Sequence, residues 1–302
     1  MNNASTANGG LAAASELSVS PSTFSCADVR PVPAASALRF NGSSQYIEIL
    51  NRGATVPVGN SPYTIEAWIK PTTMGNYGII GWGAYGGGSA VNALRLKRTG
   101  LVNYWWGNDF ELTTASLAGA WHHVAATCDG TTRTLYLDGV AIGSDRPGTH
   151  YVPDARNLRI GSTNGGEYFN GLIDEVRVWN VARTAGQLSA GRGLVLPANS
   201  AGLLAYYRLS EGSGLATADA TGTAANAGTL AGGPTWTTDA APLVAGVVVT
   251  LTVTDADGNT STVPAAVTVL PPTATAWTGA VSADWATPGN WGGCGEIGRA
   301  HV

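Results

Sequence analysis

The sequence predicts an all-β protein, built from antiparallel strands that pack as a β-sandwich. Residues 121–143, WHHVAATCDGTTRTLYLDGVAIG, alternate as three strands joined at Asp129-Gly130 and Asp138-Gly139. Asp-Gly between alternating runs favours a type I′ hairpin turn, because both central residues of that turn need positive φ. Short alternating runs separated by turn residues recur along most of the chain, which is the pattern of a sandwich. Charged residues make up only 12% of the chain, about half the usual share.

The central strand of this meander shows how the sandwich should bury its residues. Leu135 and Leu137 are expected on one face and Thr134 and Tyr136 on the other, because side chains alternate along a strand. Only residues 182–191 could form a helix, a short one weakened by a glycine. Further strands are expected at residues 16–29, 37–40, 46–49, 63–70, 78–82, 93–97, 101–106, 158–161, 171–179, 202–209, 247–254 and 260–269.

Composition and charge exclude several classes of function. The net charge of −4 leaves no basic face for nucleic acid, so no nucleic-acid partner is expected. No apolar run has the length of a membrane span, so no membrane insertion is expected in this chain. The three cysteines lie far apart and form neither a metal-binding pattern nor a disulfide framework. The low charge and the many Gly, Ser, Thr and Asn residues indicate an extracellular or cell-surface protein, and Met1 is expected to be internal to a longer one.

Five motifs in a fixed order carry a resemblance to a known family. They are ALRFNGSSQYIEI, YTIEAWIKP, WHHVAATCDGTTRTLYLDG, LRIG and FNGLIDEVRVWNVART, and they lie between residues 37 and 183. Together they resemble the laminin-G-like, concanavalin A-type jelly roll of bacterial surface proteins. The resemblance implies a jelly-roll domain over residues 37–243. It does not name a ligand, since this fold carries lectins, glycosidases and adhesion modules alike.

The flanking segments carry a second resemblance. LSVSPSTFSCADV at 17–29 and VVVTLTVTDADGNTSTVPAAVTV at 247–269 resemble the two halves of a hyalin-repeat, immunoglobulin-like module. Either the jelly roll is inserted into that module, or the chain is a misassembly. The expected organisation is an N-terminal segment and linker at 1–36, the jelly roll at 37–243, the second half-module at 244–270 and a truncated repeat at 271–295. We interpret 296–302, EIGRAHV, as a translated sequencing adapter.

The carboxylates near the end of the jelly roll do not form a catalytic pattern. Asp174 and Glu175 are neighbours in a strand, so they are expected on opposite faces. A retaining glycosidase needs two carboxyl groups about 5 Å apart on one face. The sequence therefore predicts a protein that is not an enzyme.

The family resemblance implies a different role for Asp174. Related jelly rolls bind a structural Ca²⁺ with an acid on this strand and groups from an early turn, which are Asn41 and Gly42 here. Relatives often have Asp at the position of Asn41, although an amide oxygen is an acceptable ligand. The alternative is that Asp174 caps a local turn or pairs with Arg39 or Arg177.

Two further patterns carry no metal site. Residues 255–259 resemble the start of an EF-hand loop, but Ala266 stands where the bidentate Glu is needed, so a hairpin turn is favoured. His122 and His123 are adjacent in a strand and point opposite ways, and no third ligand is visible.

An aromatic stretch at 104–109, YWWGND, is the main candidate for ligand binding. Sugar rings pack against aromatic planes and donate hydroxyl hydrogen bonds to amides and acids. Tyr104 and Trp106 should share one face and Trp105 the other; the alternative is that the tryptophans fill the core. Tyr151 and Tyr168 are loop aromatics that could also contact a ligand. The candidate binding residues are Tyr104, Trp106, Asn108, Asp109, Trp82 and Tyr85.

Taken together, the sequence predicts a non-catalytic adhesion or glycan-binding module of a multi-domain secreted or surface protein. Its partner would be a glycan or a protein of the extracellular matrix or cell surface. The alternatives are a structural spacer without a ligand and a glycoside hydrolase. An exposed aromatic patch favours binding, a wholly buried one the spacer, and paired carboxylates in a groove the hydrolase.

Overall fold

The computed structural model describes residues 36–49, 56–163 and 165–243, and the backbone of four strands between 246 and 293. The chain divides into two units, of which residues 32–243 form the larger. The expected first half-module at 17–29 lies outside the described residues. None of the described helices is both long and apolar enough to cross a membrane.

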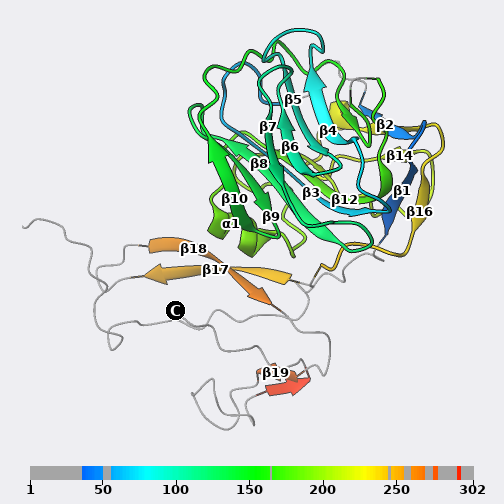
Figure 1. The fold of residues 1–302 in the computed structure, drawn as a ribbon. Helices are drawn as coiled ribbons and strands as arrows, with labels where there is room; N and C mark the ends of the chain where they lie inside the picture. Colours follow the sequence, from blue (N-terminus) through cyan, green and yellow to red (C-terminus); the bar gives the residue numbers. More distant parts are fainter. Residues whose placement is uncertain are drawn as a thin grey trace, which may run out of the picture. The chain divides into compact units, whose positions relative to one another are not determined.

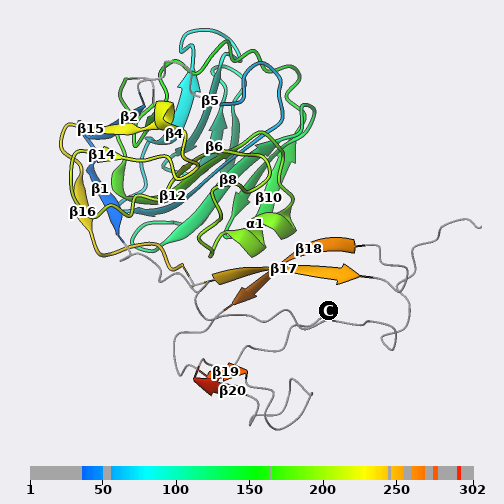
Figure 2. The ribbon, with the colours of Figure 1, turned by 180° about the vertical axis from the view of Figure 1, so that it is seen from behind.

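Almost all regular elements of the larger unit are strands (Figures 1 and 2). Its strands are β1 (Ala37–Asn41), β2 (Tyr46–Ile49), β3 (Tyr63–Pro71), β4 (Tyr77–Gly83), β5 (Val91–Leu96), β6 (Gly100–Tyr104), β7 (Phe110–Thr113), β8 (His122–Cys128), β9 (Arg133–Leu137), β10 (Val140–Asp145), β11 (Arg159–Ile160), β12 (Asn170–Trp179), β13 (Leu203–Tyr207), β14 (Ala216–Thr217), β15 (Gly228–Ala231) and β16 (Thr235–Thr237). It also contains the helix α1 (Ala185–Gly191) and a 3₁₀ turn at Ala224–Asn226.

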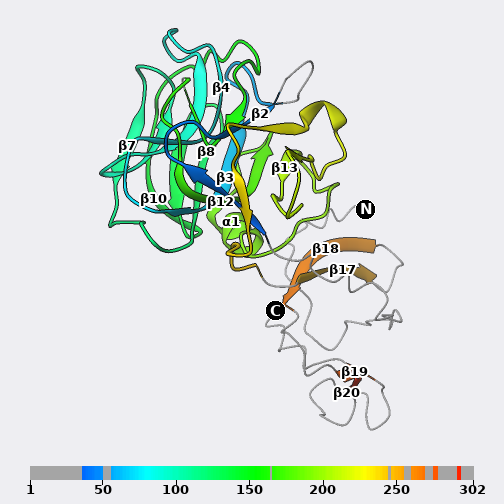
Figure 3. The same ribbon diagram turned by 90° about the vertical axis from the view of Figure 1, so that its right-hand side faces the viewer.

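These strands form two antiparallel sheets. The first sheet has the order β10-β9-β8-β3-β12-β1-β16, and β13 pairs with β12, beside which it lies in Figure 3. The second sheet has the order β14-β15-β2-β11-β4-β5-β6-β7. Strands β17 (Gly246–Thr254) and β18 (Thr260–Thr268) form the expected hairpin, and β19 (Thr275–Trp277) pairs with β20 (Trp291–Gly293). The predicted all-β jelly-roll sandwich is confirmed.

The core lies between the two sheets. Ile65 and Ile173 from the first sheet and Ile80 and Leu94 from the second are fully buried in one cluster. Side chains alternate along a strand, so every second residue of each strand points into the core and the others lie on the outer face of the sheet. We call the core side of each sheet its inner face and the opposite side its outer face.

The central meander follows the predicted alternation. Leu135 is buried in the core and Leu137 packs against it, whereas Tyr136 lies on the outer face with Ala125 and Leu188. Leu188 belongs to α1, which therefore covers the outer face of β8 and β9. The helix begins at a capping box, in which the Thr184 hydroxyl accepts from the backbone N–H of Gln187.

The two Asp-Gly turns of the meander differ from each other. At Asp138-Gly139 both residues have positive φ, 52° and 82°, as a type I′ turn requires. At the other turn the prediction is wrong, because only Gly130 has positive φ. The Asp129 carboxylate accepts hydrogen bonds from the backbone N–H groups of Thr131 and Thr132, and these bonds stabilise a longer loop instead.

A bulge in β12 corrects another prediction. Pairing with β3 shifts between Asp174 and Arg177, and Glu175 adopts φ 51°. Ile173 and Val176 both lie in the core. Asp174 and Glu175 are therefore both excluded from the inner face and lie on the same side of the sheet, not on opposite faces.

A buried polar network covers the centre of this outer face. The two Glu66 oxygens accept hydrogen bonds from Trp179 at 2.7 Å and from His123 at 2.8 Å. Burial by itself would raise the pKa of Glu66, but the His123 hydrogen bond and the charges of Arg177 and His123 lower it to about 2. The outer face of the first sheet is thus largely closed at its centre.

Candidate ligand-binding site

Three aromatic side chains gather on the outer face of the second sheet. We call Tyr85, Tyr104 and Trp106 the aromatic cluster. The ring of Trp106 meets that of Tyr104 edge-on with centroids 5.9 Å apart, and that of Tyr85 with centroids 6.0 Å apart. All three side chains are half-buried, so each ring keeps part of its surface accessible. Edge-to-face contacts of this kind fix ring orientation.

The turn that follows β6 holds Trp106 in place. Asp109 Oδ1 accepts hydrogen bonds from the backbone N–H groups of Trp105 and Trp106, at 2.9 and 3.1 Å. The Trp106 carbonyl accepts from the N–H of Ser89 at 3.1 Å, and Trp106 itself has φ 67°. Positive φ is uncommon for a non-glycine residue, so these hydrogen bonds hold Trp106 in a conformation that it would rarely adopt alone.

The neighbouring tryptophan anchors the same turn in the core. Trp105 is fully buried and stacks on His150, with ring centroids 3.7 Å apart and an interplanar angle of 6°. The Arg133 guanidinium lies over its ring at 4.2 Å, and its indole N–H donates to the Tyr63 hydroxyl at 3.0 Å. Burial lowers the pKa of His150 to about 4, so the stacked imidazole is neutral near pH 7.

A charged pair lies next to the aromatic cluster. The Arg95 guanidinium lies 4.2 Å over the Tyr104 ring and forms an ion pair with Glu167. Glu167 also accepts a hydrogen bond from the Thr163 hydroxyl at 2.7 Å. Burial raises the pKa of Tyr104, and the nearby acids Asp109 and Glu167 add to this, so its hydroxyl stays protonated. The site thus offers aromatic planes beside hydrogen-bonding groups.

Strained backbone is concentrated around this face. Of the non-glycine residues with positive φ, four lie in the loops around the cluster: Ser89, Trp106, Asn157 and Glu167. Glu167 binds Arg95, and Asn157 donates its side-chain amide to the carbonyl of Gly83. Such conformations tend to occur where function requires a fixed geometry.

The predicted binding residues divide into three groups. Tyr85, Tyr104 and Trp106 lie together, and Tyr85, expected only as a separate loop residue, joins the other two. Asn108 and Asp109 lie in the same turn but hold it, since the Asn108 amide donates to the Pro147 carbonyl at 2.7 Å. Trp82 does not contribute.

Trp82 is fully buried in the core, and its indole N–H donates to the Pro57 carbonyl at 3.0 Å. Its place at an inner position of β4 explains why it is not available to a ligand. The sequence interpretation missed Arg95, because a basic residue in a strand carries no motif of its own.

Tyr151 is an exposed aromatic residue whose backbone is hydrogen-bonded to the loop at Ser89. Its side chain is 63% exposed, and its backbone N–H donates to the carbonyl of Ser89 at 2.8 Å. Ser89 also donates its backbone N–H to the carbonyl of Trp106, so it links the backbones of Trp106 and Tyr151. Tyr168 instead packs against Tyr46, with ring centroids 6.2 Å apart.

The residues expected to hold calcium do not fit one ion. Asn41 pairs with Asn170 across β1 and β12, which places Asp174 four residues further along, about 13 Å away at a strand rise of about 3.3 Å per residue. Asn41 Oδ1 accepts from the N–H groups of Ser43 and Ser44. Gly42 lies in the same early turn with φ 76°. Among the described residues no group of three acidic, His or Cys side chains could hold a metal.

The two carboxylates on one side of β12 are not arranged for catalysis. Both are 2% exposed. Asp174 accepts from the backbone N–H of Ala241 and of Glu175, each at 2.9 Å, and Glu175 binds Arg177 at 2.7 Å and the Tyr206 hydroxyl. Their oxygens are engaged within the protein, so neither faces a substrate.

Comparison with known families agrees with this fold. Residues 41–189 match the model of the concanavalin A-like lectin/glucanases superfamily. This match covers most of the jelly roll and leaves the flanking segments unassigned. No curated protein matches the chain.

Solved structures include several similar folds. A protein from Bacteroides ovatus ATCC 8483, named a "putative carbohydrate binding protein", is 28% identical with a TM-score of 0.55; the match covers 72% of this chain and 63% of that one. A heptameric SAP-like pentraxin from Limulus polyphemus is 18% identical (TM-score 0.43; 53% of this chain, 83% of that chain). The CBM40 of the Ruminococcus gnavus IT-sialidase, bound to α2,3-sialyllactose, is 15% identical (TM-score 0.43; 53% and 98%). The latter two are too distant to bear on the ligand.

Proposed function

We propose that the jelly roll is a non-catalytic carbohydrate-binding module of a secreted or cell-surface protein, and that it binds glycan through the aromatic cluster. The observation that carries this proposal is the half-buried arrangement of Tyr85, Tyr104 and Trp106 on one outer face. Partly exposed rings offer planes to the C–H faces of a sugar. Glu167 and the protonated Tyr104 hydroxyl supply polar groups beside them, and the buried Arg95 supports the Tyr104 ring and pairs with Glu167.

The similarity to the Bacteroides protein supports the same ligand class. This chain spans 63% of that protein's length, so the activity of a whole protein does not transfer with the fold. Adhesion to a matrix or surface protein would use the same face and is the broader form of the proposal.

The carboxylates of Asp174 and Glu175 are hydrogen-bonded to other groups of the protein, which supports a module without hydrolytic activity. A glycosidase would need a carboxyl group free to protonate the glycosidic oxygen and a second one facing the sugar.

A glycan array probed with the full chain tests the proposal. Binding to a defined group of glycans supports it. Binding to none, together with a correctly folded protein by circular dichroism, would favour a structural spacer. Release of reducing sugar from a bound glycan would instead favour a hydrolase.

A further inference from the structure

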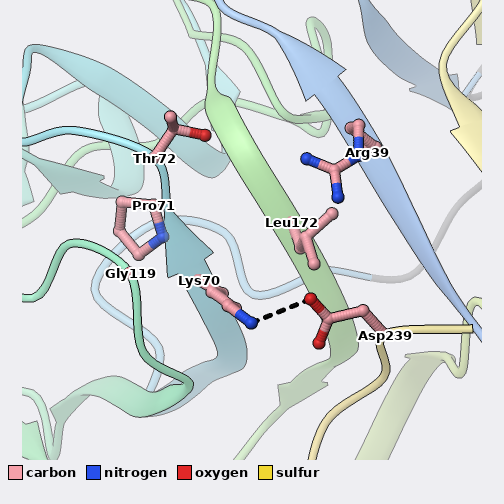
Figure 4. Close-up of a pocket in the computed structure, with 7 residues that line it drawn as sticks. All are labelled: Arg39, Lys70, Pro71, Thr72, Gly119, Leu172 and Asp239. Carbon is pink, nitrogen blue, oxygen red and sulfur yellow. Dashed lines mark hydrogen bonds and ion pairs between the residues drawn. The ribbon is translucent and has the colours of Figure 1, made fainter. Parts of the chain in front are cut away.

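A small pocket lies on the outer face of the first sheet, away from the aromatic cluster. It opens where β1, β3 and β12 run side by side, and its volume is about 200 Å³ (Figure 4). Leu172 and Pro71, both buried, supply its apolar surface. The side chains that line it include Arg39, Lys70, Pro71, Thr72, Leu172 and Asp239.

The charges around this pocket do not balance. Asp239 is the acid of the lining, and both of its oxygens are engaged: Oδ2 accepts from Lys70 Nζ at 2.8 Å and Oδ1 from the Trp121 indole at 2.9 Å. Arg39 is exposed and has no hydrogen-bond or ion-pair partner among residues 36–49, 56–163 and 165–243. Two cations therefore face one carboxylate, and the guanidinium keeps its donors for another group.

The walls of the pocket are built before any ligand arrives. Arg39, Lys70 and Leu172 stand on paired strands of one sheet. Asp239 lies on the segment after β16, which crosses this sheet and is fastened by the hydrogen bond from the Ala241 N–H to Asp174 Oδ2 at 2.9 Å. The apolar surface and the Lys70–Asp239 pair therefore need no rearrangement on binding, and Arg39 is the side chain that a ligand would order.

We propose that this pocket binds a carboxylate group, with Arg39 as its bidentate partner. A guanidinium matches the two oxygens of a carboxylate in one plane, and Lys70 adds a second positive charge. Leu172 and Pro71 would contact the apolar carbons that carry the acid. The volume is below the range of about 300–1,000 Å³ that holds a drug-sized ligand, so the pocket takes a small acid or the acidic end of a larger molecule.

Two sources could supply this chemistry, an acidic sugar and a short aliphatic acid. Calorimetric titration of the full chain with sodium glucuronate and, separately, with sodium propionate distinguishes them. The methyl ester of glucuronate and propionamide serve as neutral controls. We expect one or both acids to bind, the neutral controls to bind much more weakly, and added salt to weaken the binding of the acids.

Variants of Arg39 assign the binding to the pocket. Arg39→Ala should weaken the binding of the acid about tenfold or more, whereas Arg39→Lys, which keeps the charge but not the planar fork, should weaken it less. Arg98→Ala removes an exposed arginine from the turn between β5 and β6 and should change nothing. Trp106→Ala should also leave it unchanged, which separates this proposal from glycan binding at the aromatic cluster. Equal binding of acids and neutral controls, equal binding by wild type and Arg39→Ala, or no binding of either acid would overturn the proposal.

Discussion

At the scale of single residues, two adjacent tryptophans have opposite roles. Trp105 is clamped between His150 and Arg133 in the core, and Trp106 is half-exposed on the other side of the backbone. The rigid placement of the first fixes the second. The alternation of the sequence predicted this division, because neighbouring positions at a strand end face opposite sides.

The buried stack makes a prediction about pH. Since the pKa of His150 is about 4 in the folded protein and 6.5 in the unfolded chain, the unfolded chain alone binds a proton between these values. The contribution of His150 to stability is therefore fully present above pH 6.5, and this residue should lower the free energy of unfolding by about 3 kcal/mol as the pH falls towards 4. Urea unfolding at a series of pH values measures this dependence.

His150→Gln provides the control, because it keeps a donor for the Val91 carbonyl but does not titrate. The pH dependence over this range should become shallower in the variant. An unchanged dependence would mean that the protonation of His150 is not what destabilises the fold.

The calcium expectation leads to a second prediction at this scale. Asn41 of β1 pairs with Asn170 of β12, four residues from Asp174, and both Asn41 and Asp174 already accept backbone hydrogen bonds. We therefore expect the melting temperature to be the same in chelator and in millimolar Ca²⁺. A ligand at a hundredfold excess over its Kd would add about 2.7 kcal/mol of stability, so a clear upward shift with Ca²⁺ would show that a site exists.

At the scale of elements, the two turns of the meander differ in how they tolerate a side chain. A Cβ on Gly139 would lie 3.0 Å from the Ser189 Cα of α1, whereas one on Gly130 would meet nothing closer than 3.5 Å. Both glycines have positive φ. Gly139→Ala should therefore cost about 2–4 kcal/mol of stability, from backbone strain and overpacking, and Gly130→Ala only about 1–2 kcal/mol.

Chemical denaturation of the two variants side by side measures this difference. Equal losses would imply that α1 moves away from the hairpin without cost.

The elements also show where sequence reasoning succeeds. The pattern of alternation predicted most of the described strands, because burial on one face leaves a period of two, and the break in that pattern at 182–191 predicted α1. It could not predict the bulge at Glu175. A bulge adds one residue to a strand and so changes which face the neighbouring residues occupy, and no residue type in this segment marks it. Strands β7, β14, β15 and β16 were missed because they are short or exposed, and their sequences carry little hydrophobic contrast.

The candidate sites were predictable to different degrees. The aromatic cluster is largely local, since Tyr104 and Trp106 lie two residues apart. The pocket brings together Arg39 and Asp239, which are 200 positions apart, and only the sheet topology shows that they are neighbours.

At the scale of the whole molecule, the two ends of the jelly roll lie side by side. Its first and last strands pair, with Ala37 opposite Thr237, and the Ser36 hydroxyl donates to the Leu209 carbonyl at 3.0 Å. Ends that meet in this way are what insertion into another module would require. The split-module interpretation itself stays a prediction, because residues 17–29 lie outside the described part of the chain.

This closure predicts that residues 36–243 fold alone. A fragment of these residues should give a β-type circular-dichroism spectrum and melt cooperatively at the temperature of the jelly-roll transition in the full chain. A fragment that is unfolded, or that melts far below that transition, would show that the flanking segments support the sandwich.

The most direct test of the central claim compares the full chain with Trp106→Ala on the same glycan array. Trp236→Ala is the matched control, since Trp236 is also half-buried but lies on β16 of the other sheet. We expect Trp106→Ala to lower the glycan signal about tenfold or more, because removal of a central aromatic contact has an effect of this size. The control should keep the signal of the wild type. Equal glycan binding by wild type and Trp106→Ala would contradict the assignment of the aromatic cluster as the binding site.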